Sequence, residues 1–100
     1  MALQPQPAFT VDASVGMPVG QSSSRIALPG TPASDTVVRI ANMGTAPVAV
    51  ALGNNSVVAT NQNLVVLAGQ VQYLAINSNT YLAAICCGGN NSTLNISTGN

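Results

Sequence analysis

The sequence has no lysine, glutamate, histidine or tryptophan, and only four of its 100 residues are charged, two arginines and two aspartates. Soluble proteins usually carry about 25% charged residues, so this chain is unusually poor in ionic groups. Two arginines cannot neutralise a run of phosphates, which argues against nucleic-acid binding by counterion release. The same lack of positive charge argues against a basic helix lying on a membrane surface.

The inventory of reactive side chains is equally small. General acid–base catalysis uses His, Glu, Asp, Lys, Tyr or Cys, and three of these six types are missing. We therefore predict that the chain is not an enzyme and has no catalytic site and no cofactor. A metal site would need further His, Cys or carboxylate ligands beside the adjacent Cys86 and Cys87, so no metal is predicted.

Cys86 and Cys87 are too close in sequence to form an unstrained disulfide with each other, and the chain has no third cysteine. We expect them to act as small apolar side chains in a strand, as in a protein synthesised in a reducing bacterial cytoplasm. An intermolecular disulfide or a vicinal redox pair is the alternative.

Apolar residues are abundant but their runs are short. The stretches 64–68 and 81–87 fall well below the roughly 18 residues of a membrane helix. The residues before Pro7 have neither a basic region nor a continuous apolar run, so no secretory signal is expected. With 47% hydrophobic residues and zero formal net charge, little repulsion keeps copies of the chain apart. We expect a subunit of an assembly, with no membrane partner.

Residues 1–24 differ in composition from the rest, with three of the six prolines and the serine run 22–24. This segment is predicted to be an extended N-terminal arm in polyproline II or edge-strand conformation. A neighbouring subunit could hold it in place, or it could fold back on its own domain. Residues 25–100 are predicted to form one domain.

Within 25–100, short segments rich in Val, Ile, Leu and Ala alternate with Gly, Pro, Asn and Ser clusters about every ten residues, the pattern of a sandwich or barrel. The fold class predicted is all-β, an antiparallel β-sandwich or jelly-roll-like barrel of about seven or eight short strands. The expected strands are 25–28, 36–42, 48–52, 57–60, 64–67, 71–76, 81–87 and 93–97.

Side-chain alternation assigns faces to these strands. Residues 93–97 alternate polar and apolar, which predicts one buried and one solvated face. The strands 64–67 and 81–87 are apolar on both faces, although only one face of a sandwich strand can meet the core. Their second face is expected to meet another copy or a partner surface.

The four charges are few enough to consider one by one. Arg39 falls inside a predicted strand on the face of Val37 and Ala41, where an unpaired charge is unfavourable. An ion pair with Asp35, with Asp12 of the arm or with another subunit would resolve this, and Asp35 is equally well explained as a turn residue.

The asparagines lie mainly at segment ends, where they suit turns. A sugar-binding rim is the alternative, but the only aromatic side chains it could use are Phe9, Tyr73 and Tyr81.

Several stretches of the chain resemble small virion proteins of tailed bacteriophages, of the head decoration, cement or head-fibre type. The stretches are SSSRIALPG at 22–30, DTVVRIANMGTAPVAVALG at 35–53, LVVLAGQ at 64–70, TYLAAIC at 80–86 and STLNISTG at 92–99. Together with the apolar Pro/Val/Ser arm that precedes them, the resemblance covers most of the chain, although each stretch is short and degenerate. The near absence of charge departs from a typical surface decoration protein.

The resemblance implies a compact β-sandwich that forms homo-oligomers, trimers being favoured, and stabilises a phage head by binding the major capsid protein on the exterior of the virion. A receptor-binding or glycan-binding module of a fibre or tail is the alternative function. The residues expected to make assembly contacts are Phe9, Val11, Asp12, Arg25, Asp35, Arg39, Tyr73 and Tyr81.

Overall fold

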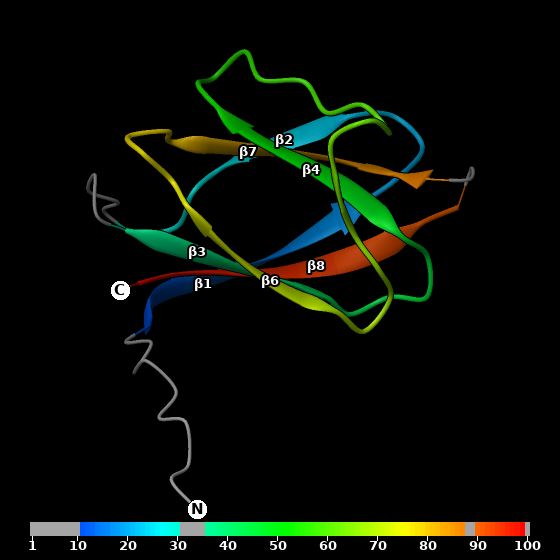
Figure 1. Ribbon diagram of the computed structural model, residues 1–100, viewed down its shortest axis with the longest axis horizontal. Helices are drawn as coiled ribbons and strands as arrows, with labels where there is room; N and C mark the ends of the chain where they lie inside the picture. Colours follow the sequence, from blue (N-terminus) through cyan, green and yellow to red (C-terminus); the bar gives the residue numbers. More distant parts are fainter. Residues whose placement is uncertain (1–10, 31–35, 88–89, 100) are drawn as a thin grey trace, which may run out of the picture.

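The computed structural model describes residues 11–30, 36–87 and 90–99, and these form eight antiparallel strands in two sheets (Figure 1). The strands are β1 (Val11–Val19), β2 (Ser24–Ala27), β3 (Val37–Asn42), β4 (Val48–Gly53), β5 (Leu64–Val66), β6 (Val71–Ala75), β7 (Tyr81–Cys86) and β8 (Ser92–Gly99).

The sheets have the order β1-β8-β3-β6, called sheet I below, and β2-β7-β4-β5, called sheet II. Consecutive strands alternate between the two sheets over much of the chain, which is the arrangement of a jelly roll. The predicted all-β sandwich or jelly-roll-like fold is therefore confirmed.

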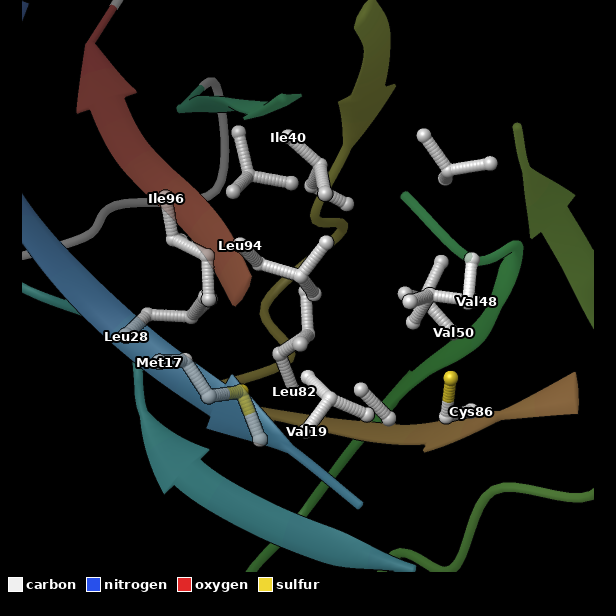
Figure 2. Packing of buried hydrophobic residues seen from close by; sticks show 14 of the residues in the cluster. Met17, Val19, Leu28, Ile40, Val48, Val50, Leu82, Cys86, Leu94 and Ile96 are labelled. Atoms are coloured by element: carbon white, nitrogen blue, oxygen red, sulfur yellow. The ribbon is translucent and has the colours of Figure 1, made fainter. Parts of the chain in front are cut away.

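The core lies between the sheets and is built from the alternating apolar side chains of nearly every strand. Figure 2 shows Ile40, Leu94 and Ile96 of sheet I meeting Val48, Val50 and Leu82 of sheet II. The predicted faces are observed in part: Leu94 and Ile96 are fully buried and Thr93 is exposed, but Ser97 on the polar face is buried as well.

Val11–Val19, which lie in the segment predicted to be an N-terminal arm, form the edge strand β1. This strand pairs antiparallel with β8 from Val11↔Gly99 to Val19↔Ser92, and Met17 and Val19 enter the core. Pro18 is tolerated because β1 is at the edge of sheet I. Two alternatives were considered for the arm, and residues 11–19 fit the second, an edge strand that folds back on its own domain. Residues 1–10 lie outside the described residues.

The segment 57–60 was expected to be a strand, and this expectation is wrong. Residues 54–63, called the covering segment below, instead cross the outer face of sheet II (Figure 1). The backbone N–H of Ala59 donates to Ser23 Oγ at 2.8 Å, beside the far edge strand β2. Because the segment pairs with no strand, its alternation reflects packing against the sheet rather than a hydrogen-bonded ladder.

The covering segment can lie close to sheet II because the residues beneath it are small. Ala49 and Ala83 are fully buried but belong to the outer face, outside the core cluster. The second face of β7 was expected to meet another copy, yet at Ala83 it is covered by the chain itself. Val57 and Ala59 point inward, while Val58 is 62% exposed.

Gly53, at the end of β4, lies close to Val57 of the covering segment. A Cβ atom on Gly53 would lie 2.8 Å from Val57 Cβ, whereas a Cβ on Gly16 of β1 would meet nothing within 4 Å. We predict that Gly53→Ala lowers the free energy of unfolding by about 1–2 kcal/mol through overpacking. Gly16→Ala should change it by less than about 0.5 kcal/mol. Urea denaturation of both variants measures the difference, and equal effects would contradict this packing.

Asn42 is a buried polar residue at the end of β3. Its Nδ2 donates to the carbonyl oxygens of Ala46 at 2.8 Å and Val66 at 2.9 Å. Its Oδ1 accepts from Ser92 Oγ at 2.6 Å and from the Gly44 N–H at 3.1 Å. The side chain thus joins both sheets at one end of the sandwich, and all of its hydrogen-bonding capacity is used.

We predict that Asn42→Ala lowers the free energy of unfolding by about 3 kcal/mol, because two buried carbonyl groups lose their donor. Asn61→Ala, at an exposed position of the covering segment, is the matched control and should cost less than about 0.5 kcal/mol. Urea denaturation monitored by circular dichroism would show whether the two substitutions differ as expected.

Candidate functional site

The outer face of sheet I, called the open face below, exposes more large apolar side chains than the outer face of sheet II, although Ala41 and Ser97 on it are buried. Four of the seven large hydrophobic side chains that are exposed in the described residues lie on it, namely Val11, Met43, Val71 and Tyr73. Met43 follows the end of β3, and its N–H donates to the Thr93 carbonyl, which continues the β3–β8 ladder. The residues of the open face are Val11, Ser14, Gly16, Pro18, Val37, Arg39, Ala41, Met43, Val71, Tyr73, Ala75, Thr93, Asn95 and Ser97.

Polar side chains on the open face bond mainly to one another. Ser14 Oγ and Ser97 Oγ are 2.8 Å apart across β1 and β8, and Ser97 Oγ donates to Asn95 Oδ1 at 3.4 Å. Covering these groups would cost less than covering solvated ones, since they already have partners. The open face is therefore suited to burial against another surface.

Arg39 is the only charged side chain among the open-face residues. It is half-buried on β3, opposite Ser97 of β8 and Tyr73 of β6. Backbone bonds join β3 to β6 at Asn42–Gln70 and at Thr36–Ile76, so Arg39 and Tyr73 form a non-hydrogen-bonded pair, whose side chains lie close together. The open face therefore has a central cation beside a half-exposed aromatic ring.

Asp12 lies at a different place, where the register between β1 and β8 shifts between Val11 and Ala13. This bulge turns the Asp12 carboxylate toward Gly30, and a Cβ on Gly30 would collide with Asp12 Oδ2. Gly30 also has a positive φ of 76°, which favours glycine. Asp12 is exposed at the edge of the sandwich, with β8 separating its strand from that of Arg39.

The remaining predicted contact residues are dispersed. Arg25 is exposed on β2 opposite Ala83, and Tyr81 is half-buried on β7 opposite Ala27. Phe9 and Asp35 lie outside the described residues. Tyr73 and Tyr81 belong to the outer faces of different sheets, so they do not form one aromatic platform for a sugar.

Of the eight predicted contact residues, the structure brings Val11, Arg39 and Tyr73 together on the open face. Sequence reasoning missed Met43 and Val71 as exposed members of it. The alternation of Val37, Arg39 and Ala41 extends to Met43 and could have indicated that residue. The exposure of Val71 depends on β6 lying at the edge of sheet I, which alternation does not reveal.

Cys86 and Cys87 differ in environment, although they are adjacent. The Cys86 side chain points into the core, where its Sγ is 3.6 Å from the Pro47 carbonyl oxygen (Figure 2). Burial, reinforced by the neighbouring Cys87, raises the pKa of the Cys86 thiol above its usual value. Both thiols are free, and Cys87 is half-buried.

We predict that iodoacetamide at pH 8 modifies Cys87 much faster than Cys86 in the folded chain, and both equally in urea. Mass spectrometry of the digested protein measures the two rates, and equal rates without urea would contradict the assignment.

The raised pKa of Cys86 also makes stability depend on pH. The contribution of the buried, protonated Cys86 thiol to the free energy of unfolding is complete below the unfolded pKa of about 8.5 and declines at higher pH.

No group of three or more His, Cys, Asp or Glu side chains that could hold a metal ion is found within 11–30, 36–87 and 90–99. In the same residues, no helix is long and apolar enough to cross a membrane.

Comparison with known proteins gives a likeness of fold. No protein-family model matches the sequence. No curated protein matches it either. Among solved structures, the chain is similar to one from the Bacillus endospore appendages, which form a family of disulfide-linked pili. The TM-score is 0.55 at 12% sequence identity, and the match covers 98% of this chain and 92% of the other. The likeness therefore extends over the whole β-sandwich.

Proposed function

We propose that this protein is a non-catalytic structural subunit that assembles with copies of itself, and that the open face is its main contact surface. The observation that carries the proposal is the contrast between the two outer faces. The chain covers Ala49 and Ala83 of sheet II with its own residues, but leaves Met43 69% exposed and Tyr73 54% exposed on sheet I. Exposed apolar side chains gathered on one face are typical of an interaction surface.

The structural neighbour supports this class of function. That protein comes from appendages described as disulfide-linked pili, and its fold matches nearly the whole of this chain. We therefore propose an exterior location, on an appendage or a particle. A disulfide between copies of this chain would use Cys87, because Cys86 is turned into the core.

The size of the open face indicates what kind of assembly to expect. The four strands, of 9, 8, 6 and 5 residues and spaced about 4.8 Å apart, present roughly 450 Å² of planar area. A stable interface usually buries about 800 Å² on each partner. Open-face contacts alone would therefore give a weak dimer, and we propose an assembly in which each subunit uses more than one contact surface.

The more specific role implied by the sequence resemblance, capsid decoration on a phage head, remains a prediction. The major capsid protein as a partner and the trimeric state rest on that resemblance alone. A test of the N-terminal segment in shell binding should delete residues 1–10 only, because a longer deletion would remove β1 from sheet I.

We predict that Tyr73→Ser and Met43→Ser each reduce self-association by about tenfold or more, because each removes exposed apolar area from the contact surface. Val58→Ser is the matched control, since Val58 is 62% exposed on the covering segment, over the other sheet. Light scattering against concentration measures the effect, with melting temperature as a check on folding. Equal loss in the control, or no loss in the open-face variants, would argue against this surface.

A further inference from the structure

The inference starts from Arg39 and rests on the proposed self-assembly. A cation that becomes covered in an interface needs an anion opposite it, because an unpaired buried charge is strongly unfavourable. The open-face residues include no carboxylate. If the open face is covered, the covering surface must therefore supply the negative charge.

The charge inventory of the chain indicates a second copy as the occupant. The sequence contains two arginines and two aspartates, so copies of the same chain can match every cation with an anion. Of the two aspartates, Asp12 is the one that the structure describes. It is exposed at the β1 bulge, on the edge of the sandwich beside Gly30.

Asp12 can accept an additional partner. It already takes part in an interaction. A carboxylate has about four lone-pair positions, however, and can receive the two parallel N–H groups of an arginine while keeping another contact. Its exposed position at an edge allows a neighbouring copy to approach without displacing a strand.

We propose that Arg39 on the open face of one copy forms an ion pair with Asp12 of a second copy, and that this pair orients the assembly. The two groups lie on different surfaces, a sheet face and a sandwich edge. Because the two paired residues differ, the contact can occur twice across a two-fold axis or repeat head to tail into a ring or filament. The pair contributes to orientation and specificity, while the apolar side chains around Arg39 supply the buried area.

Charge reversal tests the pair. Arg39→Asp and Asp12→Arg should each lower the assembly constant by about tenfold or more, since each brings like charges together. The matched control is Gln62→Asp, which adds a negative charge at an exposed position of the covering segment, over the other sheet, and should leave the assembly constant within about twofold. Light scattering and negative-stain electron microscopy report the assembly, and melting temperatures identify any variant that is unfolded.

Mixing the two single variants makes the test specific for contacts between copies. In an equimolar mixture of Arg39→Asp and Asp12→Arg chains, opposite charges meet across each contact between unlike variants, so assembly should recover to at least about half of the wild-type level. Pairing within one chain cannot give this recovery. No recovery on mixing would overturn the proposal, provided that both variants are folded.

Three further outcomes distinguish the ways in which the proposal could fail. If Arg39→Asp is instead rescued by mixing with Asp35→Arg, the assignment of Asp12 is wrong. If the wild-type chain assembles and none of the charge reversals has an effect, the ion pair is refuted while self-assembly stands. A wild-type chain that stays monomeric at every concentration would refute the proposed function as well. The neutral variant Arg39→Gln, which should show a smaller loss than Arg39→Asp, covers the case in which charge reversal prevents folding.

Discussion

The sandwich depends on the buried amide of Asn42. This side chain lies at the end of β3, yet it bonds to the carbonyl of Val66 in β5 and to the hydroxyl of Ser92 in β8. Apolar packing between two sheets is non-directional and tolerates sliding, whereas a fully bonded amide accepts one arrangement. Asn42 thus fixes how sheet I and sheet II are placed, and with them the positions of the open face and the covered face.

The two outer faces of the sandwich use small and large apolar residues differently. Alanines on sheet II leave room for a backbone to lie against the sheet, and the covering segment fills it. On sheet I, Tyr73 and Met43 stand above the sheet and would keep such a segment at a distance. Apolar side chains are therefore buried by the chain itself on the outer face of sheet II and exposed on that of sheet I.

Much of the fold could be predicted from the sequence, because strand alternation and turn residues are local signals. The strands from β2 to β8 lie close to predicted segments, and the faces of β8 and β6 follow the alternation of their residues. The segment 57–60 misled the prediction because an extended chain packed on a sheet has the same alternation as a strand. Val11–Val19 were not assigned to the domain, since Gly16 and Pro18 weaken the strand signal there.

The candidate site was harder to predict, because it depends on which strands are neighbours. Nothing local in the sequence shows that Arg39 lies opposite Tyr73, or that β8 separates Arg39 from Asp12. The residues predicted to make assembly contacts were mainly charged and aromatic residues, which are rare in this chain. That choice identified Arg39 and Tyr73 but passed over Val71, which is conspicuous only by its exposure.

The position of β8 has a consequence for the timing of folding. β8 lies between β1 and β3 in sheet I, so the first strand has no neighbour in its sheet until the last strand has been synthesised. Such long-range pairing makes folding slow compared with that of helical proteins of similar size. It also means that the open face does not exist on a nascent chain. The surface proposed for assembly is therefore complete only after β8 has been synthesised and has paired with β1 and β3.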